Sequence, residues 1–261
     1  MLFLRSSIFQ ILFYTVTLAL MVIGSPVLLL PRRWGWWIVP FWANVMLFLL
    51  RMIVGLKVEV RGKENIPQGG YILASKHQSA WETFALIPHV PNATYILKRE
   101  LRWIPIFGWY TAKFQQIPIN RGKRAAALAA MIEAAKKTIA DKRQIMIFPE
   151  GTRRPVGAEP QYKFGIAHLY KDLNCPVLPV ALNAGLYWPR ASWIIYPGTV
   201  LVEFLPPIAP GLGPRAFHNT LVDTIETASI RLCEEARTTE KPTPMLSVYD
   251  RNRKAANAEA S

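Results

Sequence analysis

The chain has 261 residues, of which 51% are hydrophobic and 9 are tryptophan. Its 31 lysines and arginines against 17 aspartates and glutamates give a net charge of +14, which attracts nucleic acid, acidic lipid headgroups or phosphorylated small molecules. A basic nucleic-acid-binding domain does not need this much apolar and aromatic surface, so the composition argues against nucleic acid and favours a membrane. The length suits one α/β core with a membrane element and leaves little room for two independent domains.

Two apolar runs occupy the N-terminal segment. No charged residue occurs between Arg5 and Arg32, and a helix that rises about 1.5 Å per residue over that stretch is about 40 Å long, comparable to a bilayer core. A second run ends at Arg51, and the arginines and tryptophans of residues 32–37 between the runs have the composition of a membrane–water interface. Residues 1–56 are therefore expected to form a helical hairpin that associates with a membrane.

Hydropathy allows two placements of this hairpin. Pro26, Pro31 and Pro40 can bend both runs, so the hairpin either crosses the bilayer or lies within one leaflet. A cleaved signal peptide is another interpretation of the first run, which follows Arg5 and ends near a Gly-Ser pair. The length of the run, the lack of an Ala-x-Ala site and the second apolar run directly behind it argue against cleavage.

Short apolar strands alternate with amphipathic helices over residues 57–237, a pattern typical of an α/β domain with a largely parallel sheet. The expected strands are Tyr71–Ser75, Phe114–Ile119, Gln144–Phe148, Val177–Leu182, Trp193–Tyr196 and Val200–Leu205. Helices are expected at Lys123–Ala140, which is rich in alanine and free of glycine and proline, and at about Phe217–Arg237. The polar residues 238–261 are expected to be a disordered tail.

A candidate catalytic pair, His77 and Glu82, follows the first of these strands, and functional residues of open α/β sheets gather where loops leave the carboxyl ends of strands. On one helix, residues five positions apart point about 140° away from each other, so His77 has to precede the helix to reach Glu82. Such a pair makes a general base, because the carboxylate fixes the imidazole tautomer and stabilises the imidazolium formed when the ring accepts a hydroxyl proton. Ser79-x-x-Glu82 is also a capping box, which gives the glutamate an alternative role at the helix terminus.

Two further loops carry groups that can bind an anion or a hydroxyl. Residues 148–154 read Phe-Pro-Glu-Gly-Thr-Arg-Arg, where the glycine permits close backbone approach, Arg153 supplies a planar fork for phosphate, and Glu150 can accept from a glycerol hydroxyl. Residues 119–122 open the alanine-rich helix, where Arg121 and the free amides of the helix start can hold an anion. An ordinary polar turn that exposes its arginines to solvent is the alternative for each loop, and an isolated Gly-Thr-Arg is more often such a turn.

Together these segments resemble the glycerolipid acyltransferase family, and especially its bacterial 1-acyl-glycerol-3-phosphate acyltransferases. His77 to Glu82, an HX4E motif, stands where the family carries His-x4-Asp, and residues 148–153 match its Phe-Pro-Glu-Gly-Thr-Arg motif without a change. Glu82 keeps the acid of the motif, whereas Lys76 replaces an asparagine that often precedes the histidine. Three further segments are similar to family blocks in the same order, at residues 97–101, 119–121 and 177–180. The resemblance covers roughly residues 58–205.

The resemblance implies a fold and a reaction. The fold is the glycerolphosphate acyltransferase fold, a mixed, largely parallel α/β sheet flanked by helices and preceded by the apolar hairpin. The reaction transfers a fatty acyl group from acyl-CoA or acyl carrier protein to the 2-hydroxyl of 1-acyl-glycerol-3-phosphate, or lysophosphatidic acid, with His77 and Glu82 as the base. Its product is phosphatidic acid, an intermediate of phospholipid biosynthesis.

The resemblance also implies site residues and a location. The substrate-binding residues correspond to Lys98, Arg121, Glu150, Gly151, Thr152 and Arg153. Among these, the two arginines and the lysine are expected to bind the phosphate, the glutamate to orient the glycerol, and amides near the glycine to stabilise the oxyanion. No metal and no cofactor besides the thioester co-substrate is expected. The expected location is the bacterial inner membrane, with the catalytic domain facing the cytoplasm.

Two alternative functions use the same sequence features differently. The His/Glu pair can acylate another lyso-lipid, such as lyso-ornithine lipid, and an acceptor without phosphate makes Lys98 and Arg153 less important. A non-catalytic membrane lipid-binding protein would account for the basic charge and the apolar hairpin, but it needs neither His77 nor Glu82.

Overall fold

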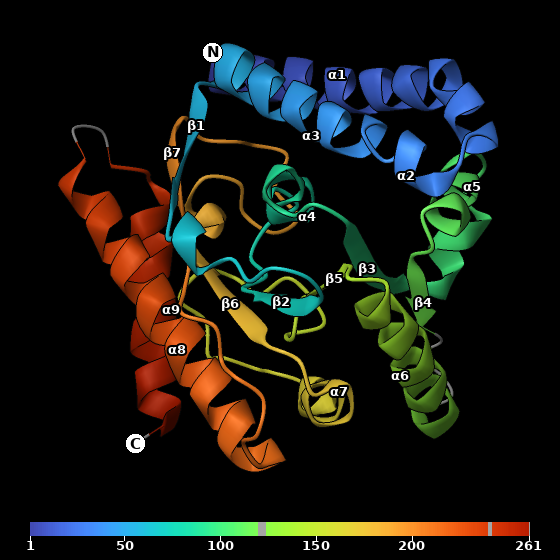
Figure 1. Cartoon of the computed structure of the whole chain (residues 1–261). Coiled ribbons are helices and arrows are strands. Elements are labelled where there is room, and N and C mark those ends of the chain that lie inside the picture. The colour runs from blue at the N-terminus through green and yellow to red at the C-terminus, as the bar shows by residue number, and fades with distance from the viewer. Residues whose placement is uncertain (120–123, 240–241, 261) are drawn as a thin grey trace.

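The computed structural model describes residues 1–119, 124–239 and 242–260. Within these residues, a central seven-stranded sheet has the order β1-β7-β6-β2-β5-β3-β4 (Figure 1). Its strands are β1 (Leu56–Arg61), β2 (Tyr71–Ser75), β3 (Ala93–Lys98), β4 (Ile117–Ile119), β5 (Gln144–Ile147), β6 (Val177–Leu182) and β7 (Gly198–Phe204). Neighbouring strands are parallel except for β6 and β7, which confirms the expected mixed, largely parallel sheet.

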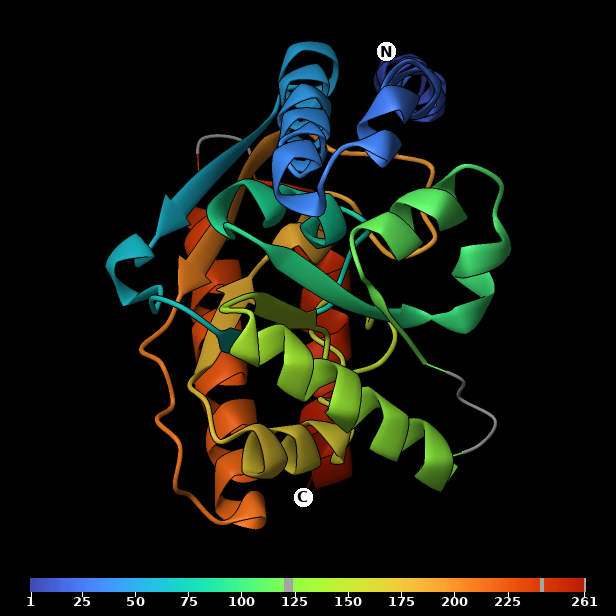
Figure 2. The same ribbon diagram turned by 45° about the vertical axis from the view of Figure 1, so that its right-hand side comes forward.

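Side chains of the strands alternate between two faces, and helices cover both. On β2, Ile72 and Ala74 pack against a layer of three helices (Figure 2), whereas Tyr71 and Leu73 belong to a core shared with the N-terminal helices and α4 (Glu82–Ala85). The three helices of the first layer are α6 (Arg124–Ala140), α7 (Gly165–Leu173) and α8 (Pro214–Glu235). The N-terminal hairpin is therefore part of the α/β/α architecture and not a separate appendage.

The expected hairpin is present at the N-terminus. It consists of α1 (Leu2–Ile23), η1 (Ser25–Leu29), α2 (Arg32–Gly35), α3 (Ile38–Leu49) and the π-helical turn η2 (Leu50–Val54). Helices α1 and α3 run side by side across one edge of the molecule (Figures 1 and 2). By length and composition, Leu2–Ile23 and Arg32–Val54 are each able to cross a membrane. Their inward side chains Phe9, Met46 and Leu50 are buried in the core.

Two expected strands differ from the structure. The strand expected at Phe114–Ile119 is shortened to β4, because the chain before it forms helix α5 (Phe107–Lys113). Residues 193–196 are not a strand: the Ile195 amide donates to the Ser6 hydroxyl of α1 at 3.0 Å, so this segment bonds to the hairpin and not to the sheet.

The C-terminal segment expected to be a disordered tail contains helix α9 (Met245–Ala260). Leu246 and Tyr249 on this helix are buried in the core, and Asp250 forms an ion pair with Arg237. The expectation of disorder is wrong because the average polarity of the segment conceals a narrow apolar face, which is enough to hold a helix once a surface is available to cover it.

Candidate active site

The first loop of the site brings His77 and Glu82 into direct contact. His77 lies between the end of β2 and the start of α4, and its Nδ1 is 2.9 Å from Glu82 Oε1. The same oxygen accepts hydrogen bonds from the backbone amides of Gln78 at 2.8 Å and Ser79 at 2.7 Å. Glu82 thus contacts the histidine and also satisfies amides at the helix start, so the expected His77–Glu82 contact and the expected role at the helix terminus occur together.

This geometry fixes the tautomer of His77. Because Glu82 Oε1 already accepts from two backbone N–H groups, it acts as the acceptor toward the ring, and Nδ1 carries the hydrogen. Nε2 is then the basic nitrogen. The ring also stacks on Phe148 with centroids 4.2 Å apart and an interplanar angle of 19°, which holds its plane in place.

The second loop lies next to the first because β2 and β5 are neighbours. Ala74 pairs with Ile147, so the chains leave the sheet side by side. Two hydrogen bonds then join the loops: the Arg154 amide donates to the His77 carbonyl at 2.8 Å, and the His77 amide donates to Glu150 Oε2 at 2.7 Å. The Phe-Pro-Glu-Gly-Thr-Arg segment therefore holds the main chain of His77.

The structure contradicts the expected contact between Glu150 and a glycerol hydroxyl. Glu150 has no exposed side-chain surface, and its second oxygen, Oε1, accepts from Lys76 Nζ at 2.8 Å. Both carboxylate oxygens are therefore bonded inside the protein. The sequence could not show this, because Lys76, the partner of Glu150, lies 74 positions away in the chain.

The remaining predicted residues lie around the same edge of the sheet. Lys98 is the exposed last residue of β3, the next strand beyond β5. Arg153 is half-buried and Thr152 is exposed on the second loop. Gly151 adopts φ +70°, a left-handed conformation that favours glycine, and its amide donates to the Phe148 carbonyl at 2.9 Å. Arg121 lies outside the described residues.

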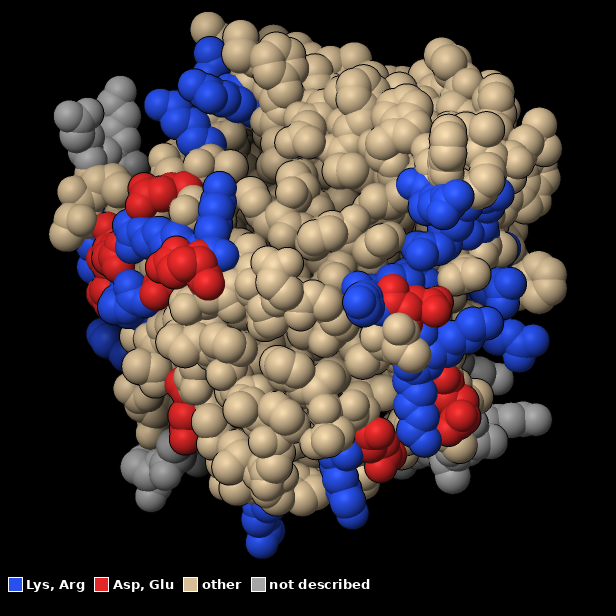
Figure 3. All heavy atoms as spheres, in the orientation of Figure 1, with Lys and Arg blue, Asp and Glu red and all other residues tan. Residues whose placement is uncertain are grey.

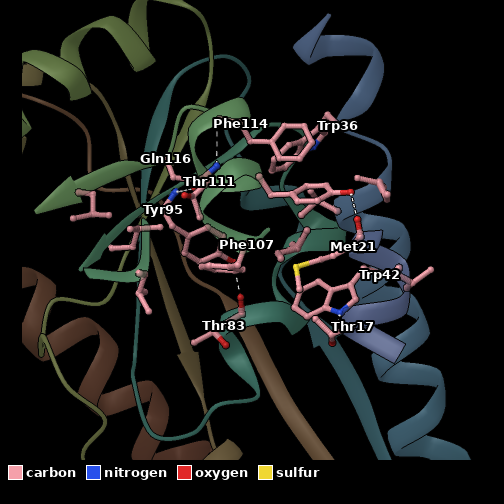
Figure 4. Close-up of a pocket in the computed structure, with 18 of the residues that line it drawn as sticks. Thr17, Met21, Trp36, Trp42, Thr83, Tyr95, Phe107, Thr111, Phe114 and Gln116 are labelled. Atoms are coloured by element: carbon pink, nitrogen blue, oxygen red, sulfur yellow. Dashed lines mark hydrogen bonds between the residues drawn. The ribbon is translucent and has the colours of Figure 1, made fainter. Parts of the chain in front are cut away.

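A cavity of about 440 Å³, which the sequence did not reveal, separates the hairpin from β3 and α5 (Figure 4). This volume falls within the range of typical small-molecule sites. Met21 and Trp42 of the hairpin line it on one side, and Tyr95 and Phe107 line it on the other. Its wall includes Phe148, on which the His77 ring stacks, so a single side chain separates the cavity from His77.

Polar side chains in the cavity wall are bonded within the protein. The Thr111 hydroxyl donates to the Gly108 carbonyl at 2.8 Å, and the Tyr95 hydroxyl donates to the Thr83 carbonyl at 2.8 Å. Gln116 Oε1 accepts from the Tyr95 amide at 2.6 Å. The cavity therefore presents mainly hydrocarbon and aromatic surface, which suits an apolar guest.

Comparisons with known proteins give the family. Residues 57–183 match the family described as Acyltransferase. The 1-acyl-sn-glycerol-3-phosphate acyltransferase of Pseudomonas aeruginosa is 40% identical over 193 residues, which are 74% of this chain and 75% of that protein. The chain belongs to this acyltransferase family. A second relative, the 1-acyl-sn-glycerol-3-phosphate acyltransferase of Saccharomyces cerevisiae, is 29% identical over 64% of this chain and 56% of that protein.

The acyltransferase also shares its fold with a solved structure. The crystal structure of PlsC from Thermotoga maritima, a 1-acyl-sn-glycerophosphate (LPA) acyltransferase, superposes with a TM-score of 0.74 over 89% of this chain and 99% of that chain, at 23% sequence identity. The family resemblance and the enzyme class inferred from the motifs are thus confirmed. Across the described residues, no group of three or more His, Cys, Asp or Glu side chains is arranged to hold a metal ion.

Proposed function

We propose that this acyltransferase transfers a fatty acyl group from acyl-CoA or acyl carrier protein to the 2-hydroxyl of lysophosphatidic acid and releases phosphatidic acid. The observation that carries the proposal is the His77–Glu82 pair beside an apolar cavity, since a base for a hydroxyl and a space for a hydrocarbon chain lie in contact through Phe148. The 40% identity to the Pseudomonas aeruginosa 1-acyl-sn-glycerol-3-phosphate acyltransferase supports this choice of acceptor.

His77 is the base in this mechanism. Its Nε2 takes the proton of the acceptor hydroxyl as the oxygen attacks the thioester carbonyl, and Glu82 stabilises the imidazolium that forms. The tetrahedral intermediate then collapses, the carbon–sulfur bond breaks, and the imidazolium returns its proton to the departing thiolate. The ester and a free thiol result, and the enzyme regains its starting protonation state.

The cavity holds a fatty acyl chain. Each methylene group moved from water into an apolar site stabilises the complex by about 0.8 kcal/mol. The Thr111 hydroxyl and the Gln116 carbonyl oxygen in the wall do not oppose this gain, because they are already bonded within the protein. The acyl chain can therefore supply binding energy that positions the carbonyl beside His77.

Lys98, Arg121 and Arg153 bind the acceptor phosphate. Lys98 and Arg153 lie on the carboxyl side of neighbouring strands β3 and β5 and present their cationic groups outside the buried core. A guanidinium forms paired hydrogen bonds with phosphate oxygens, whereas an ammonium acts as a point charge. The acceptor phosphate would then hold the glycerol end of the lipid at the same edge of the sheet as His77.

The hairpin lies within one leaflet of the bacterial inner membrane, with the catalytic domain on the cytoplasmic side. Helix α1 is tied to the α/β domain near both ends: Trp193 Nε1 donates to the Ser7 hydroxyl at 2.8 Å, and the Tyr110 hydroxyl donates to the Met21 carbonyl at 2.9 Å. These two contacts keep α1 along the surface of the α/β domain, which supports the one-leaflet placement.

The outer face of the hairpin suits this placement. The exposed large apolar side chains of the hairpin include Phe3, Leu4, Ile11, Tyr14, Leu18, Val22, Trp34, Trp37, Phe41 and Phe48. In the space-filling view, Lys and Arg gather at the two ends of the hairpin and leave the surface between them uncharged (Figure 3). Trp103 and Trp109, which are exposed near α5, extend the aromatic surface beyond the hairpin. Such a face inserts among lipid tails while the flanking cations meet acidic headgroups.

Chemical labelling tests the placement. In proteoliposomes with the catalytic domain outside, a membrane-impermeant thiol reagent should modify Arg33→Cys at the hairpin turn without permeabilisation. Modification only after the vesicles are opened would contradict the one-leaflet placement, because the turn of a spanning hairpin lies on the opposite side.

Acyl transfer to lysophosphatidic acid by the reconstituted protein tests the reaction, with labelled acyl-CoA and acyl carrier protein supplied separately. We expect transfer with at least one donor, and a loss of about 10²- to 10⁴-fold in kcat for His77→Ala. Unchanged activity in His77→Ala would overturn the mechanism. If the wild type acylates only a phosphate-free lyso-lipid, the proposed acceptor is wrong, but the proposed role of His77 as the base is unaffected.

A further inference from the structure

Lys76 is a buried cation directly before the catalytic histidine. Only 4% of its side chain is exposed, and its Nζ lies between two carboxylates, 2.8 Å from Glu150 Oε1 and 2.6 Å from Glu226 Oε1. Glu226 belongs to α8, 150 positions away in the chain. The Tyr162 hydroxyl donates to the same Glu226 oxygen at 2.7 Å. A connected set of polar groups thus joins α8 to the start of the catalytic loop.

These connected polar groups extend to the main chain of His77. Glu150 uses Oε1 for Lys76 and Oε2 for the His77 amide, so the lysine and the histidine amide hold opposite oxygens of one carboxylate. Burial opposes the charge of Lys76, but the carboxylates of Glu150 and Glu226 outweigh this and raise the pKa of its ammonium above the ordinary value. The lysine is therefore a charged bridge, and neither carboxylate is left without a cationic partner.

We propose that Glu226 is a positioning residue of the acyltransferase, which acts through Lys76 to hold Glu150 against the His77 main chain and so sets the place of the imidazole. The inference rests on the proposed role of His77 as the base. Lys76 and Glu226 form a matched pair: the asparagine often found at position 76 in the resembled family is too short to bridge Glu150 and α8. With asparagine there, two buried carboxylates would face each other without a cation between them.

A cycle of three variants tests the proposal: Lys76→Asn, Glu226→Gln and the double variant. Lys76→Asn should lower kcat on the order of 10²-fold, because a small displacement of a catalytic group has an effect of that size. Glu226→Gln alone should lower kcat only a few-fold, since Lys76 keeps Glu150 as a partner. The double variant should be about tenfold more active than Lys76→Asn, because it removes one of the two carboxylates that the first change leaves facing each other without a cation.

The split between kcat and KM separates positioning from a merely structural role. Lys76 and Glu150 are covered by protein and Glu226 exposes only 15% of its side chain, so KM for both substrates should stay unchanged while kcat falls. Glu235→Gln is the matched control: Glu235 also lies on α8 and pairs with a strand residue, Arg61 of β1, at 2.7 Å. This control should lower the melting temperature slightly and leave kcat unchanged.

Several results would overturn the positioning role of Glu226. Independent effects of the two substitutions, or equal losses of kcat in Glu226→Gln and Glu235→Gln, would overturn the inference. If Lys76→Asn does not fold, recovery of folding in the double variant supports the pairing, and failure to recover refutes it. The assays use whichever lyso-lipid the wild type acylates, with His77→Ala in parallel. A His77→Ala variant that keeps its activity overturns the proposed function itself, whereas absence of coupling overturns only the role of Glu226.

Discussion

The His77 loop and the apolar cavity lie on either side of Phe148 and are built in opposite ways. In the loop, polar atoms bond to one another, and Glu82 Oε1 alone accepts three hydrogen bonds. In the cavity wall, polar side chains such as Thr111 bond to nearby backbone, and apolar groups from the hairpin, β3 and α5 define the space. One region is shaped by directional bonds and the other by packing.

Under the proposed function, this contrast separates the residues that carry the chemistry from the residues that accommodate the lipid. Removing one partner of a buried hydrogen bond leaves the other unsatisfied, so the loop tolerates little change at the bonded atoms. An apolar wall tolerates changes of shape as long as it stays apolar and filled. We therefore expect substitutions in the loop to lower kcat, and substitutions in the wall to change which acyl chains are accepted.

The largest effect is expected for Glu82→Gln, which keeps the size of the side chain and removes its charge. The imidazolium of His77 loses its stabilising carboxylate, and the amide group can hold the ring in the wrong tautomer. Steady-state acyl transfer should show a fall in kcat of about 10²- to 10⁴-fold with little change in KM. Glu133→Gln, which removes an exposed carboxylate of α6, is the control and should behave as wild type. If kcat for Glu82→Gln stays within a few-fold of wild type, the Glu82 carboxylate has no part in the mechanism.

An intermediate effect is expected for Arg153→Ala, which tests the phosphate contact at the rim of the loop. Loss of a charge-assisted hydrogen bond should raise KM for lysophosphatidic acid about 10- to 100-fold, with a smaller effect on kcat. Lys171→Ala removes an exposed cation of α7, on the other side of the sheet from the hairpin, and serves as the control. If Arg153→Ala raises KM equally for a phosphate-free acceptor, Arg153 does not bind the phosphate.

The smallest effect is expected in the cavity wall, where Val39→Phe on α3 fills part of the space. Long acyl donors should lose about fourfold in kcat/KM for each methylene excluded, while short donors keep their rates. Val22→Phe adds the same bulk to the exposed face of α1 and should leave the chain-length profile unchanged. If Val39→Phe instead lowers kcat/KM equally for donors of all chain lengths, the cavity does not bind the acyl chain.

Sequence patterns were sufficient where short-range physics sets the structure. Strands β2 and β6 have the expected bounds, since each is a continuous apolar run between polar or turn-forming residues. The requirement that His77 precede the helix follows from helical spacing, and the structure confirms it. The approach of the two loops follows from the rule that working loops leave the carboxyl ends of neighbouring parallel strands.

The expectations that failed concern groups whose partners lie far away in the chain. Glu150 was expected to contact a substrate, but in the structure its two oxygens accept hydrogen bonds from Lys76 and from the His77 amide. Residues 193–196 have the composition of a strand, but their polar backbone is satisfied partly by Ser6. Helix α9 looked disordered on average composition because its covering surface comes from residues distant in sequence.

The sequence by itself determined the acyltransferase family of this protein and the contact between His77 and Glu82. A histidine and an acid at a spacing of five, after a strand, require only one turn of loop to meet, and the Phe-Pro-Glu-Gly-Thr-Arg segment supplies the neighbouring loop. Only the tertiary structure decided the size of the apolar cavity, the packing of the hairpin against the α/β domain and the bridge from Glu226 through Lys76 to the His77 loop. The physical reason is range: hydrogen bonds within a loop are set by local spacing, whereas a cavity or a buried ion bridge exists only where distant segments pack together.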